Sequence, residues 1–365
     1  MKFPVTLFVV SLVWATASCA QGPVDTGLTP ETRAVFRNLH GMQGKGIMIG
    51  HQDALAYGVG WKYEEGRSDI HDVTGDHPAV YGWELGRIEL GWPNNLDSVP
   101  FDRMRSFIRK GYEAGGVITI SWHLNNPLTG KTAWDPAEGT VASILPGGSK
   151  HDVYNRWLDS LAGFLGSLKG SRGEAIPVVL RLFHELNGDW FWWGRKHCSP
   201  EELKALWRHT VSYLRDKKGL HNLIYAFNTD RFATVEDYLE RYPGDEWVDL
   251  VGFDIYQRKE GNEKFRSDLD GMLTRLESIA EAHHKIPALT EFGYGGLPDP
   301  DWWTGTFWKV LKGHHVVWAL AWRNGDAGSC FMPYRGQASA ADFVKMYDDA
   351  KSWFGKDVID RKYYR

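Results

Sequence analysis

The sequence predicts an α/β fold, a single (β/α)8 barrel, and three observations support this. Short apolar, β-branched runs recur eight times along the 365 residues, segments with helical periodicity separate them, and no Pro- or Ser-rich linker divides the chain. A strand followed by a helix, repeated eight times, is typical of this barrel. A doubly wound open sheet is the alternative, but the sequence has neither a GxGxxG motif after an early strand nor a Walker loop.

The eight expected strands are mostly continuous apolar runs rather than strict alternations of apolar and polar residues. This pattern fits strands that are buried on both faces, as in a parallel sheet. In chain order the strands are expected at 46–51, 78–83, 116–122, 177–183, 222–227, 248–255, 287–290 and 316–322.

Helical periodicity occupies the segments around these runs. The first helix is expected over 29–39, with Thr29 as its N-cap and Pro30 in its first turn. Longer helices are expected over 101–114, 154–168, 200–217 and 265–284. The barrel domain therefore covers 29–354, and 355–365 is expected to be a C-terminal tail.

Residues 1–20 are expected to be a secretory signal and not part of the fold. Lys2 precedes an apolar stretch over 3–14, and small residues follow up to Ala20, where cleavage is expected. Cys19 allows a second interpretation, in which cleavage occurs before it and its sulfur is lipidated. Either way we expect an exported protein that is periplasmic, secreted or lipid-anchored at the cell surface.

The composition excludes some partners and suggests another. Lys and Arg number 42 against 46 Asp and Glu, and this weakly acidic balance argues against nucleic acid as the main partner. The 18 Trp, 15 Tyr and 17 Phe suggest a cleft lined with aromatic rings, whose flat apolar faces suit sugars. Cys198 and Cys330 are expected either to pair or to remain buried thiols, and the sequence leaves both open.

Polar and aromatic residues follow every expected strand. In this barrel the working residues lie at the carboxyl ends of the strands, so these side chains should meet at one rim. In strand order they are His51, Gln52 and Asp53; Trp83 and Glu84; Trp122 and His123; His184 and Glu185; Asn228 and Asp230; Asp254 and Tyr256; Glu291; and Trp322 and Arg323.

Two carboxylates in this set suit the cleavage of a glycosidic bond. Strand four runs directly into Glu185 in PVVLRLFHELNGDWFWWG, and strand seven ends on Glu291 in PALTEFGYGG. Glycosidases use one carboxylic acid to protonate the leaving oxygen and a second carboxylate to attack or to activate water. The two groups are about 5–5.5 Å apart in retaining enzymes and about 6.5–9.5 Å apart in inverting ones.

The longest motifs resemble those of one family. HELNGDWFWWG at 184–194 and TEFG at 290–293 resemble the two catalytic signatures of glycoside hydrolase family 26. The members of that family are mostly β-mannanases. The resemblance extends over about residues 30–350 and includes GHQDALAYG at 50–58, ISWHLNNP at 120–127, WVDLVGFDIY at 247–256 and AWRNG at 321–325.

The resemblance implies a role for each matching residue. Glu185 would be the acid/base, Glu291 the nucleophile of a retaining reaction, and Tyr256 a hydrogen-bond donor to that nucleophile. The implied sugar contacts are His123 and His184 around the cleavage point, Trp190 beside the leaving group, Trp322 under the attacked sugar and Arg323 at the next sugar. Glu185 must be protonated at rest, and the apolar rings of 190–193 would favour its protonated form. We expect some of these rings to lie in the core and one or two to line the cleft.

We therefore expect a monomeric endo-β-1,4-mannanase that acts on mannan, galactomannan or glucomannan and needs neither cofactor nor metal. The alternatives within the family are an exo-acting mannobiohydrolase, a β-1,3-xylanase or a mixed-linkage β-glucanase, and a remote one is a non-catalytic glycan-binding protein. A metal-dependent or serine hydrolase is disfavoured, because the sequence has no HxH at a strand end, no HExxH and no GxSxG.

Overall fold

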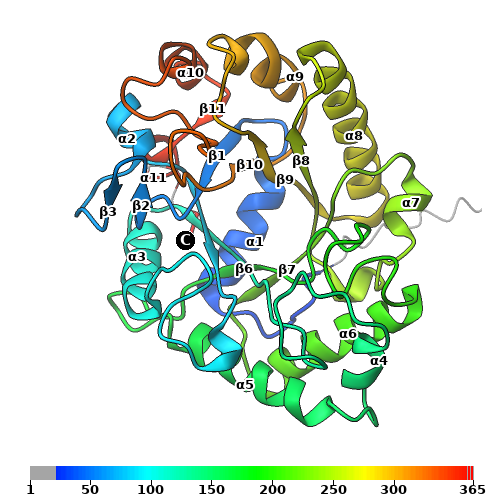
Figure 1. Ribbon diagram of the computed structural model, residues 1–365. Helices are drawn as coiled ribbons and strands as arrows, with labels where there is room; N and C mark the ends of the chain where they lie inside the picture. Colours follow the sequence, from blue (N-terminus) through cyan, green and yellow to red (C-terminus); the bar gives the residue numbers. More distant parts are fainter. Residues whose placement is uncertain (1–21, 360, 362, 365) are drawn as a thin grey trace, which may run out of the picture.

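The computed structural model describes residues 22–359, 361, 363 and 364, and these form the expected barrel (Figure 1). All eight predicted strands are present and parallel, and the sheet closes because β10 pairs with β1. Ser352–Trp353 (β11) adds to the start of β1, and Tyr57–Gly58 (β2) and Trp61–Lys62 (β3) form a small hairpin at the rim. The barrel strands are β1 Ile47–Gln52, β4 Val80–Glu84, β5 Val117–Ser121, β6 Val178–Arg181, β7 Leu223–Thr229, β8 Leu250–Gln257, β9 Ile286–Tyr294 and β10 Trp318–Ala321.

Most helices lie around the outside of the barrel, whereas α1 crosses the barrel's centre in the view of Figure 1. The five predicted helices are confirmed, and their ends differ where the sequence carries no capping signal: α5 and α8 each begin three residues earlier than expected, after N-caps that lack a side-chain hydrogen bond. The helices are α1 Pro30–Met42, α2 Asp69–Thr74, α3 Phe101–Glu113, α4 Thr140–Ile144, α5 His151–Ser167, α6 Pro200–Ser212, α7 Val235–Leu239, α8 Asn262–His283, α9 Trp308–Leu311, α10 Ala340–Tyr347 and α11 Gly355–Ile359.

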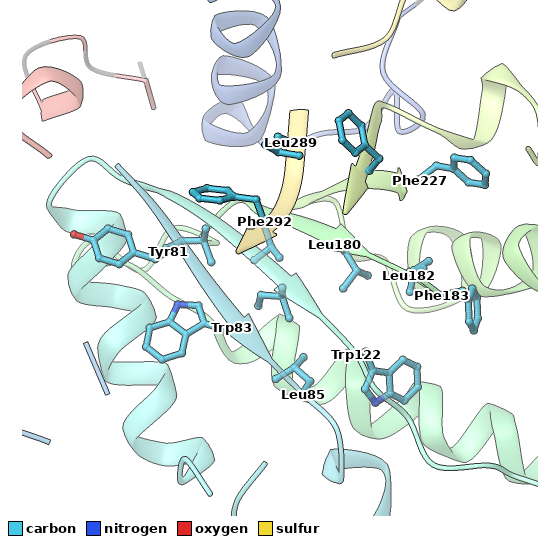
Figure 2. Packing of buried hydrophobic residues seen from close by; sticks show 14 of the residues in the cluster. Tyr81, Trp83, Leu85, Trp122, Leu180, Leu182, Phe183, Phe227, Leu289 and Phe292 are labelled. Atoms are coloured by element: carbon cyan, nitrogen blue, oxygen red, sulfur yellow. The ribbon is translucent and has the colours of Figure 1, made fainter. Parts of the chain in front are cut away.

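Two apolar layers hold these elements together. Alternate residues of each strand point into the barrel, where they form one cluster, and the others pack outward against the helices. Figure 2 shows part of the outward-facing layer, including Trp83, Trp122, Leu180 and Phe292. The inner cluster contains Met48, Val80, Val117, Val179, Ile224, Leu250, Ala288 and Leu320.

Helix α1 covers the end of the barrel opposite the site. Its apolar face, which includes Val35, Leu39 and Met42, belongs to the inner cluster, and Thr29 Oγ1 accepts a hydrogen bond from Thr32 N at 3.3 Å as an N-cap. The segment after Phe354, expected as a tail, forms α11 and packs against the same end, where Tyr363 is buried. The domain boundary itself stays a prediction.

Three further expectations concern the leader, the membrane and the cysteines. The signal over 1–20 and its Cys19 lie outside the described residues. Among the helices of the described part, none is both long and apolar enough to cross a membrane. Cys198 and Cys330 are free thiols, which decides the question that the sequence left open.

Candidate active site

The turn after β6 places Glu185 in a strained backbone conformation. Phe183 and Glu185 have φ angles of 46° and 52°, in the left-handed region that costs an L-residue about 1–2 kcal/mol. Packing and hydrogen bonds hold this turn: the Phe183 ring packs against Trp192 and Trp193, and Trp193 Nε1 donates to the His184 carbonyl at 3.0 Å. The side chain of Glu185 is thus fixed at the rim by the buried rings that follow it.

The four consecutive aromatic residues divide between core and site. Trp192 and Trp193 are fully buried, and Trp192 Nε1 donates to the Leu124 carbonyl at 3.1 Å. Trp190 is half-buried, and its Nε1 donates to Glu185 Oε2 at 2.7 Å. The expected core rings are confirmed, and Trp190 is the member that touches a candidate catalytic group.

A β-bulge in β9 turns Glu291 inward. Phe253 of β8 pairs with Leu289, but the next residue, Asp254, pairs with Glu291, so Thr290 is the extra residue. Side chains alternate along a regular strand, and Leu289 points outward, so a strand without the bulge would also turn Glu291 outward. With the bulge, Thr290 and Glu291 both face the barrel interior, and Thr290 Oγ1 donates to Asp254 Oδ1 at 2.8 Å.

Three carboxylates and one guanidinium meet at the centre of the rim. Oxygen atoms of Glu185, Asp254 and Glu291 lie within 4.8 Å of one another. Arg181 Nη2 donates to Glu291 Oε1, and its Nη1 lies 3.4 Å from Asp254, while the Tyr256 hydroxyl donates to Glu291 Oε2 at 2.8 Å. Such a cluster has the ligand types of a metal site, but the Arg181 cation already contacts two of its three carboxylates.

The surroundings drive the two glutamates toward different protonation states. Burial raises the pKa of Glu185 to about 8, and the negative charges of Glu291 and Asp230 add to the shift. Burial also lowers the pKa of Arg181, but attraction to Glu291 and Asp254 outweighs this and raises it overall. At neutral pH the site therefore holds a protonated Glu185 beside the contact between Arg181 and Glu291.

A buried chain of hydrogen bonds fixes the two predicted histidines. His123 Nδ1 lies 2.7 Å from Glu84 Oε2, and its Nε2 lies 3.0 Å from His184 Nε2. Burial opposes charge on His123, but Glu84 raises its pKa overall, whereas burial and the His123 charge lower the pKa of His184. These opposite shifts favour donation from His123 Nε2 to His184 Nε2, and His184 Nδ1 is buried without a partner within the described chain.

The distal part of the rim holds Arg323, and the guanidinium of this residue is already bound by a carboxylate. Its Nε lies 2.8 Å from Asp97 Oδ1, and Asp97 comes from the loop over 85–100 between β4 and α3. Beside them the Tyr57 hydroxyl donates to Asp53 Oδ2 at 2.7 Å. Burial, and then repulsion from Asp97, raises the pKa of Asp53 above its usual range. The remaining oxygens, Oδ1 of Asp53 and Oδ2 of Asp97, are buried without a partner among the described residues.

Two aromatic rings lie close to His123 at the rim. Trp134 stacks on His123 with ring centroids 5.1 Å apart and planes 18° apart, and half of the Trp134 side chain is exposed (50%). Trp322 is half-buried, with its ring centroid 6.2 Å from that of His123. Exposed faces of this kind suit the stacking of sugar rings.

The structure brings most of the predicted residues together and adds others. Glu185, Glu291, His123, His184, Trp190, Tyr256 and Trp322 lie at one centre, and Arg323 lies in a neighbouring cluster with Asp97. Sequence reasoning did not name Arg181, Trp134 or Asp97, and it placed Glu84 at the rim without a specific role. For Arg181 the signal was present, because a charge inside the apolar run VVLRLF requires a buried partner.

A closed barrel that carries two carboxylates close together, one after β6 and one within β9, has the fold and the site of a glycoside hydrolase. The model of glycosyl hydrolase family 26 matches residues 24–325, and the chain belongs to this family.

Known structures and curated proteins agree with this assignment. A GH26 β-mannanase from Bacteroides ovatus superposes with a TM-score of 0.89 at 44% identity, covering 92% of this chain and 98% of that one. A modular endo-β-1,4-mannanase from Cellulomonas fimi superposes with a TM-score of 0.83 at 34% identity, covering 92% and 78%. A mannan endo-1,4-β-mannosidase from Bifidobacterium adolescentis is 32% identical over 92% of this chain but only 36% of its own length. This chain thus spans about a third of that relative, and 52% of a Bacillus subtilis enzyme of the same name.

Proposed function

We propose that the protein is a retaining β-1,4-mannanase in which Glu291 is the nucleophile and Glu185 the acid/base. The observation that carries this proposal is the short separation of the carboxylates, because oxygen atoms of Glu185 and Glu291 lie within 4.8 Å of each other. This separation is nearer to the about 5–5.5 Å of retaining enzymes than to the about 6.5–9.5 Å of inverting ones. The β-mannanase names of the similar proteins support mannan as the polymer.

The reaction proceeds in two displacements. A Glu291 oxygen attacks the anomeric carbon while the bond to the leaving oxygen breaks, and Glu185 gives its proton to that oxygen. Glu185, now a carboxylate, takes a proton from water, and the water oxygen attacks the same carbon and releases Glu291. The raised pKa of Glu185, caused first by burial, lets it start as the acid at neutral pH.

The test is a product profile. The mature chain is incubated with unbranched mannan, galactomannan, β-1,3-xylan and mixed-linkage β-glucan, and the products are resolved over time. We expect a ladder of manno-oligosaccharides whose new reducing ends are β-anomers in early NMR spectra. Cleavage of xylan or glucan alone would overturn the substrate, early α-anomers would overturn retention, and intact polymers with a folded protein would favour the glycan-binding alternative.

One observation favours a second candidate, release of mannobiose from a chain end. The contact between Arg323 and Asp97 joins the loop over 85–100 to the rim after β10, and a cleft closed at this contact would admit only the end of a chain. Mannobiose as the first and main product would support this exo-acting candidate over the endo-acting one.

We also propose that the protein acts outside the cytoplasm, on the basis of the leader over 1–20. Cell fractionation tests export, and labelling with a radioactive fatty acid in the native protein and in Cys19→Ala tests the lipid anchor. Label that persists in Cys19→Ala would contradict the anchor at this residue.

A further inference from the structure

The two candidate catalytic residues stand on different supports. Glu291 lies within β9, where the neighbouring strands on both sides pair with its backbone. Glu185 lies beyond the end of β6, and the pairing of β6 with β7 ends at Arg181 and Ala226. Loops move more than strands, and a displacement of about 1 Å can cost about 10²-fold in rate. The loop that carries Glu185 therefore needs a support that β6 does not supply.

The side chain of Asn187, two residues after Glu185, joins this loop to the next one. Its Oδ1 accepts a hydrogen bond from Asp230 N at 2.7 Å, and its Nδ2 donates to the Arg231 carbonyl at 2.9 Å. An amide side chain has both an acceptor and donors, so Asn187 here takes the place of a neighbouring backbone peptide. The segment after β6 is thus joined again to the segment after β7, beyond the point where the pairing of the two strands ends.

The backbone that Asn187 binds is itself fixed. Arg231 Nη2 donates to the Tyr256 carbonyl at 2.8 Å and its Nη1 donates to Asp268 Oδ2 at 2.9 Å, so the segment after β7 is tied to β8 and to α8. The turn that precedes Asn187 is strained, because the φ angle of Glu185 is 52°. Such conformations persist only where the surrounding contacts determine them. Asn187 provides two such contacts, in addition to those of the buried rings.

We propose that Asn187 is a positioning residue of the acid/base: its amide, bonded to the backbone after β7, holds the Glu185 carboxyl group where it meets the leaving oxygen. This inference rests on the proposed role of Glu185 as the acid/base. The carboxyl group must come within about 2.6–3.2 Å of the leaving oxygen to give up its proton, so a loosened turn weakens proton donation first. Glu291 is held by β9 and not by this turn, so its attack should be affected less.

The experiment compares Asn187→Leu and Asn187→Gln with a control, Asn222→Leu. Asn222 also joins the segments of β6 and β7, because its Nδ2 donates to the Ile176 carbonyl at 2.8 Å, but it does so at the opposite end of both strands. Each variant is assayed on mannan, whose leaving oxygen needs a proton, and on a dinitrophenyl β-mannoside, whose leaving group needs none. The measured quantity is kcat/KM, which reports the first displacement on both substrates.

The expected losses depend on the leaving group. Asn187→Leu removes both hydrogen bonds, so kcat/KM should fall by about 10–10²-fold on mannan and by less than about threefold on the dinitrophenyl mannoside. Asn187→Gln keeps the amide on a longer side chain and should lose about 3–10-fold on mannan. Asn222→Leu should keep the wild-type ratio of the two values, even where heat-melting curves show that it is less stable.

Several outcomes overturn the inference. Equal losses on both substrates would do so, as would a loss confined to mannan that the control shares. A ratio of the two values within about twofold of wild type in Asn187→Leu also contradicts the role, and if this variant does not fold, Asn187→Gln decides by the same criterion. Failure of the proposed function is distinct, because the wild-type enzyme would then hydrolyse no mannan, or Glu185→Ala would lower both values equally.

Discussion

The cluster around Glu291, which is the proposed cleavage point, and the cluster around Arg323, which is the proposed distal end of the cleft, are built from similar parts that are held differently. Each combines one arginine with two carboxylates and a tyrosine that donates to one of them: Arg181 with Glu291, Asp254 and Tyr256, and Arg323 with Asp97, Asp53 and Tyr57. The side chain of Arg181 is 1% exposed, whereas that of Arg323 is 36% exposed.

The difference lies in which elements supply the groups. At the cleavage point every member belongs to a barrel strand, so hydrogen bonds along the sheet fix its position. At the distal end Asp97 comes from a loop, and loops vary and move more than the strands they join. We infer that the strand-built cluster serves the chemistry, which tolerates little displacement, and the loop-built cluster sets how much of the chain fits.

The largest expected effect tests the strand-built cluster. Glu291→Gln keeps the shape of the side chain but removes the attacking charge, so kcat on mannan should fall at least about 10⁴-fold. Mannan hydrolysis measured by reducing-sugar release checks this, with Glu113→Gln on the exposed face of α3 as the control. Activity near the wild-type level would remove Glu291 from the nucleophile role.

Loss of the acid should depend on the leaving group. Glu185→Ala should lower kcat on mannan by about 10²–10⁴-fold, because a sugar oxygen leaves poorly without a proton. A dinitrophenyl β-mannoside, whose leaving group needs no proton, should be affected far less in its first step. Added azide should restore turnover and give β-mannosyl azide. Equal losses on both substrates would contradict the acid role.

The loop-built cluster is tested by the length of the products. Asp97→Ala frees Arg323 and loosens the loop over 85–100, so products longer than those of the wild type should accumulate severalfold if this contact limits the cleft. Chromatography of early products checks this, with Asp102→Ala, exposed at the start of α3, as the control. An unchanged ladder would mean that the cleft is open past Arg323.

The smallest effect concerns pH. Burial raises the pKa of Glu185 to about 8, so activity should fall on the basic side as pH rises through that value. The Trp190 N–H donates to the charged form and lowers this pKa, so Trp190→Phe should move the basic limb to higher pH and change kcat by less than about tenfold. The control is Trp308→Phe, whose N–H bonds Asp349 away from the rim. A basic limb that moves downward would contradict this hydrogen bond.

The sequence predicted the cleavage point well and the distal end poorly, for physical reasons. Apolar runs mark buried strands, and in a parallel barrel their carboxyl ends meet, so Glu185, Glu291 and Tyr256 could be placed without coordinates. Asp97 could not be placed from the sequence, because no local periodicity fixes how a loop folds back toward Arg323. The bulge at Thr290 was equally hidden: the residue count along a strand shows neither the extra residue nor the face on which Glu291 ends.

In the left-handed turn after β6, the residue proposed for catalysis lowers the thermal stability of the fold. At Glu185, with φ of 52°, glycine would relieve strain and also remove a buried carboxyl group. The folded pKa of about 8 lies above the ordinary 4.5, so the folded form binds more protons than the unfolded form, and this group destabilises the fold increasingly from about pH 4.5 to 8. An inactive Glu185→Gly enzyme should therefore melt at a higher temperature than the active one, and most clearly in mild alkali. The residue that enables turnover would then be one that the fold accommodates at a loss of stability.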